Sequence, residues 1–240
     1  MNIKSILIII QRSNGDVFLS SSLIDQLKIS FMDAKIDLLV NSDTSSIAKT
    51  LKNVNKIYKF SYEKKNKNRY KQERDIFKKI YRKYDLSINL TSSDRSVIYS
   101  LLASRKSISA IEKNKLKSWW KKILLKHYYF FDEDEHILTN NLRSLDFLGI
   151  EPVMQVFPAT YSQKSLDLIK NKLNDLKITK FIIFHPSAQY EYKVYNKKLR
   201  GELLSLLDSI NIPIVITGGG NDIDLKIKES LPKLKNVYDF

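Results

Sequence analysis

Short apolar runs alternate with amphipathic stretches along the first half of the chain. The apolar runs predict strands at residues 3–10, 36–40, 56–60, 85–90 and 107–111. Helical spacing of apolar positions predicts helices at 17–27, 44–51, 67–83 and 94–103. Strands that alternate with helices indicate an α/β fold with a parallel sheet, so one Rossmann-like unit is expected in this half.

The second half begins with a broad apolar helical face at 136–148, which Gly149 is expected to terminate. Residues 151–158 carry two prolines and no periodicity, which is typical of an interdomain linker. Further helices are predicted at 165–176, at 197–210 and after 218–222, with strands at 180–184, 212–217 and 236–240. We therefore predict two Rossmann-like domains, 1–150 and 151–240, of which the second is incomplete.

The pattern changes between Leu116 and Phe131, where both tryptophans and four other aromatic residues lie among cations. Rings interleaved with lysines suit a membrane interface, where the rings lie at headgroup level and the cations meet anionic lipid. Core or interdomain packing explains the same rings equally well, and the sequence leaves both interpretations open. The acidic run 132–135 is interpreted as the first turn of the following helix.

Composition excludes several classes of protein. No apolar run approaches the ~18 residues that a membrane-spanning helix needs. The start of the chain lacks a small-residue cleavage site after its apolar run, so no secretory leader is predicted. The chain has no cysteine, which excludes disulfides, a thiolate nucleophile and a thiolate metal site. A cytoplasmic protein is expected.

The net charge of +15 is unevenly distributed. Residues 1–150 hold 28 basic and 16 acidic side chains, a net +12, whereas 151–240 hold 13 and 10, a net +3. Such a field favours an anionic partner, which could be nucleic acid, an anionic membrane surface or a phosphorylated substrate. The lysine-rich stretch 63–71 is by itself interpreted as a solvated surface rather than a binding site.

Asp16 is the first candidate for chemistry. It follows the buried strand 3–10 and a glycine turn, and ligands of open parallel sheets bind at the carboxyl ends of strands. The alternative is that Asp16 is the N-cap of the next helix, a position that aspartate often occupies. Position alone favours capping, and the wider sequence pattern favours catalysis.

That wider pattern resembles the ADP-heptose:lipopolysaccharide heptosyltransferases, glycosyltransferase family 9, which have the two-domain glycosyltransferase B (GT-B) architecture. The resemblance depends on the order and spacing of five motifs across nearly the whole chain: Arg12-Ser-Asn-Gly-Asp-Val17, Tyr84-Asp-Leu-Ser-Ile-Asn-Leu90, Leu145-Asp-Phe-Leu-Gly-Ile150, Phe184-His-Pro-Ser-Ala188 with Lys193, and Ile216-Thr-Gly-Gly-Gly220.

The resemblance implies roles for individual residues. Asp16 would be the general base that takes the proton of the acceptor hydroxyl. Ser187 would hold a donor phosphate, with Ala188 or Gln189 at the next phosphate contact. Lys193 would neutralise the departing diphosphate, a role needed because the family requires no metal.

Gly218 and Gly219 could let the backbone approach a phosphate, although a tight turn explains them equally well. His185 is interpreted as a structural histidine at a strand end. The family's donor-gripping Asp-Ser/Thr-Gly-Pro segment and its histidine do not occur in these 240 residues. The chain is therefore expected to be a fragment of a longer protein or the product of a shortened gene.

The resemblance implies an inverting glycosyltransferase that reacts in an interdomain cleft. It would have no cofactor, with ADP-heptose as donor substrate and the lipopolysaccharide lipid A-core as acceptor. It would lie peripherally on the cytoplasmic membrane face, against anionic lipid, with no nucleic acid partner. The alternatives are a catalytically impaired truncated relative and a basic protein that binds nucleic acid or another anionic surface.

Overall fold

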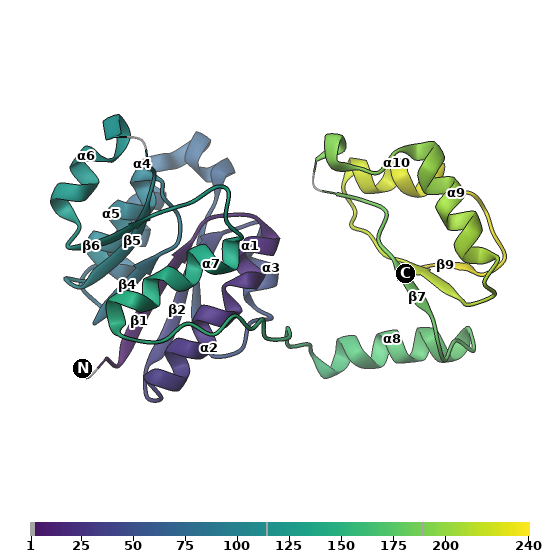
Figure 1. Cartoon of the computed structure of the whole chain (residues 1–240), viewed down its shortest axis with the longest axis horizontal. Helices are drawn as coiled ribbons and strands as arrows, with labels where there is room; N and C mark the ends of the chain where they lie inside the picture. The colour runs from purple at the N-terminus through teal and green to yellow at the C-terminus, as the bar shows by residue number, and fades with distance from the viewer. Residues whose placement is uncertain (1–2, 114, 189) are drawn as a thin grey trace. The chain divides into compact units, whose positions relative to one another are not determined.

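The computed structural model describes residues 3–113, 115–188 and 190–240. The chain forms two compact units, Met1–Tyr161 and Ser162–Phe240, here called unit 1 and unit 2. Each unit is a layered α/β structure with its own parallel sheet (Figure 1). The predicted fold class is therefore confirmed.

Unit 1 is built on a six-stranded sheet in the order β3-β2-β1-β4-β5-β6, and every neighbouring pair is parallel. The strands are β1 (Ser5–Ile10), β2 (Lys35–Asn41), β3 (Val54–Phe60), β4 (Leu86–Asn89), β5 (Ser107–Ile111) and β6 (His127–Phe130). The first five match the predicted runs. We missed β6 because it has no continuous aliphatic run and forms only by pairing with β5 at the sheet edge.

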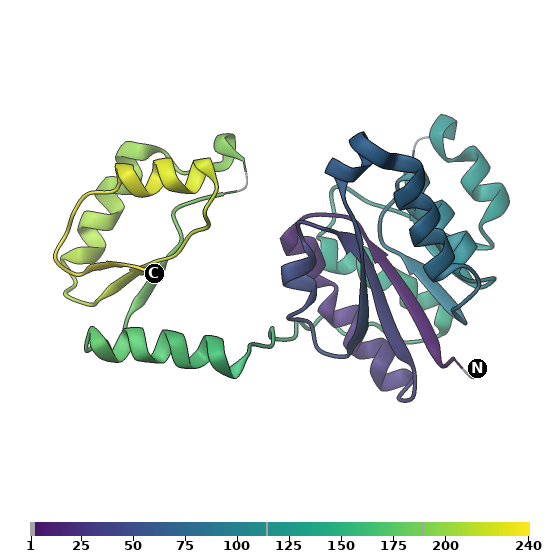
Figure 2. The same ribbon diagram turned by 180° about the vertical axis from the view of Figure 1, so that it is seen from behind.

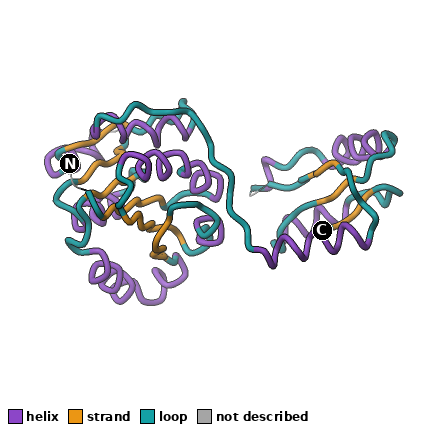
Figure 3. The backbone as a smooth tube through the Cα atoms, turned by 90° about the horizontal axis from the view of Figure 1, so that it is seen from below, coloured by secondary structure: helices purple, strands orange, loops and turns teal. Residues whose placement is uncertain are grey.

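Helices cover both faces of this sheet, so its strands lie between helical layers (Figure 3). The helices are α1 (Asn14–Leu19), α2 (Ser21–Ser30), α3 (Ser45–Ala48), α4 (Tyr62–Ile80), α5 (Asp94–Ala103), α6 (Lys115–Leu124), α7 (Ile137–Leu142) and the 3-10 helix η1 (Arg143–Leu148). Ile6, Ile8 and Ile10 of β1 belong to the apolar cluster that includes residues of α2 and α7. Leu7 and Ile9 belong to the cluster that includes residues of α4 and α5. A strand buried on both faces needs apolar residues at every position, which explains the continuous run.

Two predicted helices are interrupted. The helix expected over 17–27 is α1 and α2, which meet at Ser20. The helix expected over 136–148 is α7 followed by η1, and it stops at Gly149, whose φ of 67° favours glycine.

The acidic run 132–135 precedes helix α7, with His136 as the N-cap, so its prediction as a first helical turn was wrong. Two of its carboxylates are instead bound by cations. Asp132 pairs with Lys113 at 2.8 Å, and Glu135 pairs with Arg143 at 2.8 Å.

The proline-bearing segment 151–161 is irregular, but it packs with unit 1. The backbone N–H of Val153 donates to Gln26 Oε1 at 2.8 Å, and Gln26 Nε2 donates to the Val153 carbonyl at 2.9 Å. The Thr160 N–H donates to the Thr50 carbonyl at 2.6 Å. The compact units therefore divide after Tyr161, whereas the sequence placed the division after residue 150.

Unit 2 contains a parallel three-stranded sheet in the order β7-β8-β9 (Figure 2). Its elements are α8 (Gln163–Asp175), β7 (Ile182–Phe184), the 3-10 helix η2 (Glu191–Lys193), α9 (Lys197–Asp208), β8 (Ile214–Ile216), α10 (Asp222–Ser230) and β9 (Val237–Asp239). Its core is small and centres on Leu204, Ile214 and Ile216. None of the helices that the structure describes has the length and apolar character to cross a membrane.

Candidate functional site

The strand order of unit 1 contains a switch point beside β1. The chain runs outward from β1 to β2 and β3 on one side, and continues to β4, β5 and β6 on the other. Ligands of open α/β sheets bind outside the carboxyl ends of the strands at such a point. The loops after β1 and β4 meet there, because the Gln11 N–H donates to Thr91 Oγ1 at 2.9 Å.

Asp16 lies in the first turn of α1 at this switch point. Ser13 is the N-cap, and its Oγ accepts a hydrogen bond from the Asp16 N–H at 3.4 Å. In return, Asp16 Oδ2 accepts from the Ser13 N–H at 3.2 Å and from Ser13 Oγ at 2.9 Å. This reciprocal pair is a capping box. Asp16 is therefore not the N-cap, which lies three residues earlier at Ser13. Its carboxylate nevertheless takes part in capping.

The two oxygens of the Asp16 carboxylate have different surroundings. Arg12 Nε also donates to Oδ2, at 3.3 Å, and the Arg12 guanidinium lies 4.3 Å from the centre of the Phe131 ring. Among the described residues none hydrogen-bonds Oδ1, and the carboxylate side chain is 23% exposed. One oxygen thus fixes the orientation of the carboxylate while the other can accept a proton, which a general base requires.

A basic groove lies between β3 and α4. It has a volume of about 360 Å³, and Lys59, Lys64, Lys71 and Lys79 line it, with Asp75 as the one acid in the lining. Lys59 lies near the carboxyl end of β3, two strands from β1. At the usual strand spacing, the carboxyl ends of β1 and β3 are about 10 Å apart. The four lysines of the groove suit an anionic group.

Two pKa shifts occur at or just after β6, an edge strand of unit 1. Burial raises the pKa of Tyr129 above its ordinary value. The hydrogen bond from Lys113 lowers the pKa of Asp132 below its ordinary value.

Unit 2 has a pocket of about 240 Å³ at the carboxyl ends of its strands. Ser187, after β7, and Gly218 and Gly219, after β8, line it together. Three of the four residues predicted to bind the donor are thus brought to one pocket. Ala188 is next to Ser187 and half-buried but does not line it, and Gln189 lies outside the described residues.

Close packing against the Asp224 carboxylate requires a glycine at position 219. The Gly219 N–H and Asn221 Nδ2 donate to Asp224 Oδ2 at 2.8 Å and 2.7 Å, and Asn221 Oδ1 accepts from the Asp224 N–H at 3.0 Å. A Cβ at Gly219 would lie 2.6 Å from Asp224 Oδ2. Close packing against a carboxylate therefore requires this glycine. We overlooked Asp224, although the Asn-x-x-Asp spacing before an apolar helix is a capping signal.

Lys193 does not line this pocket. It ends η2, is exposed, and places Nζ 5.6 Å and 5.7 Å from the ring centres of Tyr190 and Tyr192. These two rings stack with centres 5.6 Å apart. An aromatic platform therefore holds the lysine outside the pocket.

His185 links the loops after β7 and β8. Its Nδ1 lies 3.1 Å from Thr217 Oγ1, and its Nε2 lies 3.5 Å from Ser187 Oγ. Thr217 and Ser187 both line the pocket, so the histidine helps to set its shape.

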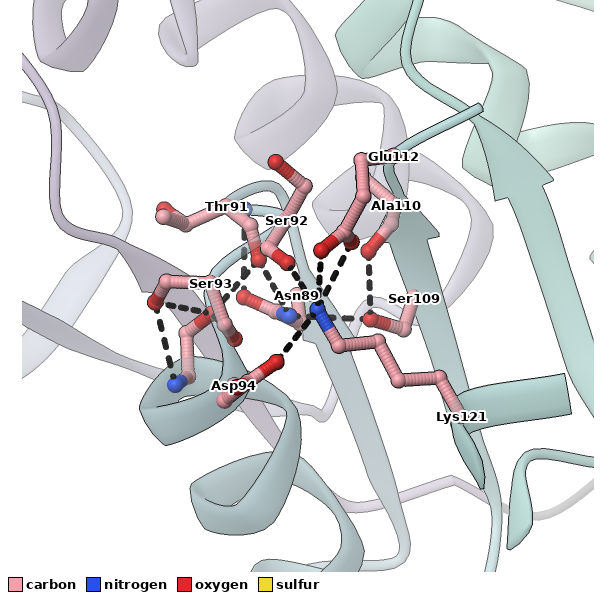
Figure 4. Close-up of polar contacts among 10 residues, drawn as sticks. Asn89, Thr91, Ser92, Ser93, Asp94, Ser109, Ala110, Glu112 and Lys121 are labelled. Carbon is pink, nitrogen blue, oxygen red and sulfur yellow. Dashed lines mark hydrogen bonds and ion pairs between the residues drawn. The ribbon is translucent and has the colours of Figure 1, made fainter. Parts of the chain in front are cut away.

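A buried lysine near the carboxyl ends of β4 and β5 was also missed (Figure 4). Lys121 Nζ is fully buried and donates to Glu112 at 2.6 Å and 2.8 Å and to the Ser92 carbonyl at 2.7 Å. It also pairs with Asp94 at 2.8 Å. No signal in the sequence distinguishes Lys121 from the neighbouring lysines.

Comparisons with known proteins show that the chain is similar to heptosyltransferases. No protein-family profile matches it. It is 25% identical over 222 residues to lipopolysaccharide heptosyltransferase 3 of Escherichia coli, and 24% identical over 228 residues to the protein of that name from strain K12. These matches cover 89% and 92% of this chain but only 64% and 65% of the relatives, so the chain spans about two thirds of their length.

Solved structures show the same fold. A glycosyl transferase family 9 protein from Veillonella parvula has a TM-score of 0.79 at 14% identity, covering 100% of this chain and 70% of that one. E. coli heptosyltransferase WaaC, solved with ADP-2-deoxy-2-fluoro heptose, has a TM-score of 0.72 at 14% identity, covering 98% and 76%. E. coli ADP-heptose lps heptosyltransferase II has a TM-score of 0.68 at 18% identity, covering 95% and 69%. The resemblance to heptosyltransferases and the GT-B-like architecture are thus confirmed.

Proposed function

We propose that this chain is an inverting glycosyltransferase that transfers heptose from ADP-heptose to the lipopolysaccharide inner core. The observation that carries the proposal is the Asp16 carboxylate at the switch point, with Oδ2 fixed by Ser13 and Arg12 and with Oδ1 free of hydrogen bonds from described residues. The sequence matches to lipopolysaccharide heptosyltransferase 3 support the reaction class.

Asp16 acts as the general base in this proposal. Its Oδ1 takes the proton of an acceptor hydroxyl while the hydroxyl oxygen bonds to the anomeric carbon, and the bond from that carbon to the ADP oxygen breaks. Attack opposite the leaving group inverts the anomeric centre. General-base catalysis of this kind contributes about 10²–10⁴-fold to a rate.

The donor is proposed to bind at the pocket of unit 2. The Ser187 hydroxyl and the backbone of Gly218 and Gly219 line it, and all three can contact a diphosphate. Lys193 is the cation proposed to offset charge on the departing ADP. No metal or other cofactor is part of this proposal.

The acceptor is proposed to bind at unit 1. The four lysines of the groove between β3 and α4 complement the phosphates of an inner-core acceptor. The net charge of +12 on residues 1–150 also favours an anionic acceptor, and it favours catalysis at the anionic cytoplasmic face of the membrane.

The test is turnover of ADP-heptose on truncated lipopolysaccharide. Asp16→Asn keeps the shape of the side chain and removes the base, so we expect the rate to fall about 10²–10⁴-fold with ADP affinity unchanged. Lys193→Met should slow turnover as well. Asp33→Asn, at an exposed carboxylate in a loop, is the matched control and should leave the rate unchanged.

The alternative within the same family is a catalytically impaired relative that binds the donor without transferring the sugar. ADP binding without any turnover would replace our proposal by this one. Full activity in Asp16→Asn would remove Asp16 from the mechanism. Binding to nucleic acid or to another anionic surface that is unaffected by ADP and falls steeply with salt would favour the basic binding protein.

A further inference from the structure

Helix α6 faces the protein with its polar side and solvent with its apolar side. Ser118 and Lys121, one turn apart on α6, are buried, as is Leu125 directly after the helix. Trp119 and Ile123, on the opposite face, are 60% and 72% exposed, and Leu124 beside them is exposed too. A surface helix of a globular protein ordinarily has the reverse arrangement.

The ion cluster around Lys121 maintains this orientation. Lys121 Nζ contacts the Glu112 carboxylate after β5, Asp94 at the start of α5 and the carbonyl of Ser92 (Figure 4). A buried lysine without these partners would be strongly unfavourable, so α6 cannot rotate to bury its apolar face without breaking the cluster. The tryptophan and isoleucine are therefore held outward.

A groove between α5 and α6 extends the exposed face. It has a volume of about 480 Å³, with apolar lining from Trp120 and Leu124 of α6 and from Ile98 and Leu101 of α5. Arg82 and Arg105 also line it. Apolar surface beside two guanidinium groups suits acyl chains next to phosphate headgroups.

The segment that contains α6 is basic. Residues 113–126 hold six lysines and no acid. Two of these lysines are already paired, Lys121 with Glu112 and Asp94, and Lys113 with Asp132. Lys122 lies over the ring of Phe130, 5.1 Å from its centre.

We propose that this face of α6, formed by Trp119, Ile123 and Leu124, docks the chain onto an anionic lipid bilayer. Tryptophan favours the membrane–water interface, and surrounding lysines are attracted to anionic headgroups. A second copy of the chain fits less well, because α6 packed against α6 would bring the same lysines together. The proposal stands on α6 alone and is independent of the transferase activity.

The test is flotation of the whole chain with vesicles of phosphatidylcholine and phosphatidylglycerol in equal parts. Trp119→Glu and Ile123→Glu should each lower the partition coefficient about tenfold or more, because a charge replaces buried apolar area. Ile29→Glu is the matched control, since Ile29 is 71% exposed on α2, and it should stay within about twofold of the parent. Vesicles of phosphatidylcholine alone, or added salt, should weaken binding by the parent.

Circular dichroism and urea unfolding establish that each variant is folded. Equal flotation of the parent, Trp119→Glu and Ile123→Glu overturns the proposal, as does equal loss in Ile29→Glu. If the parent is a dimer that Ile123→Glu converts to a monomer while flotation is unchanged, the face binds a second copy and the proposal is wrong. Turnover on a soluble acceptor, measured in parallel, should not change in Ile123→Glu, so the result is separable from the proposed reaction.

Discussion

At the scale of single residues, the carboxylate of Asp16 takes part in capping and also has the oxygen that the proposed catalytic role needs. Oδ2 completes the capping box with Ser13, and Oδ1 is left available for proton transfer. Because the cap restricts rotation of the side chain, it positions the proposed base before any substrate binds. Capping is therefore compatible with catalysis at this residue.

Gly219→Ala should disturb the pocket of unit 2. The new Cβ would lie 2.6 Å from Asp224 Oδ2, so the loop must shift and the hydrogen bond from residue 219 to that carboxylate must weaken. Asn221 Nδ2 still donates to this carboxylate, and we expect the weakened hydrogen bond to cost about 1 kcal/mol. Urea unfolding should show that loss, and calorimetry should show weaker binding of ADP.

Gly220→Ala is the control for this variant, because a Cβ there meets nothing within 4 Å. It should retain both stability and affinity for ADP. Equal effects of the two substitutions would mean that the contact with Asp224 does not determine the shape of the loop.

At the scale of elements, Asp85 joins the amino ends of β1 and β4. Its Oδ2 accepts from the Lys4 N–H, the Ser5 N–H and Ser5 Oγ, each at 2.9 Å. The hydrogen bond from the Lys4 backbone, followed by that from the Ser5 side chain, lowers the pKa of the Asp85 carboxyl below its ordinary value. The charged form therefore stabilises the pairing of the two strands.

Asp85→Ala should lose this contribution in a pH-dependent way. A folded-state pKa below the unfolded value adds stability that is complete above about pH 4 and is lost as the pH falls through the folded pKa. We expect a loss of about 1 kcal/mol at pH 7, because the group is exposed, and a loss that shrinks in acid. Urea titrations from pH 7 to about pH 2.5 measure it, with Asp33→Ala as control. A difference that stays constant with pH would contradict the assignment.

The elements also show which patterns were informative. The first five strands of unit 1 and all three strands of unit 2 were predicted from apolar runs. The pattern is clearest in β1, which is buried on both faces of the sheet. Strand β6 was missed, since His127–Phe130 gains its strand character from pairing with β5. The interruption at Ser20 was missed as well, because the helical periodicity continues across it.

At the scale of the whole molecule, the two units differ in how much core they contain. Unit 1 has a six-stranded sheet between two helical layers, with apolar clusters on both faces. Unit 2 has three short strands around Leu204, Ile214 and Ile216. Small domains bury a smaller fraction of their surface and are correspondingly less stable.

Residues 1–161 expressed alone should therefore fold cooperatively, and 162–240 alone should be the less stable piece. Differential scanning calorimetry should show a transition for 1–161 within about 5 °C of the main transition of the whole chain, because the two cores are separate. An unfolded 1–161 fragment would show that unit 1 depends on unit 2.

The sequence by itself determined the fold class, the positions of most strands and the resemblance to heptosyltransferases, because these depend on local patterns of burial and on motif order. It also identified Ser187, Gly218 and Gly219, which follow the strands whose carboxyl ends form the pocket of unit 2. Loops after parallel strands converge on one edge wherever the sheet forms, so this grouping follows from topology.

Only the tertiary structure decided which oxygen of Asp16 is held, that Lys193 rests on two tyrosines outside the pocket, and that Lys121 is the buried lysine of its helix. These outcomes depend on groups distant in sequence, such as Glu112 and Asp94 around Lys121. A lysine within a lysine-rich helix has no local mark of burial, because its partners come from neighbouring strands and helices that only folding brings together.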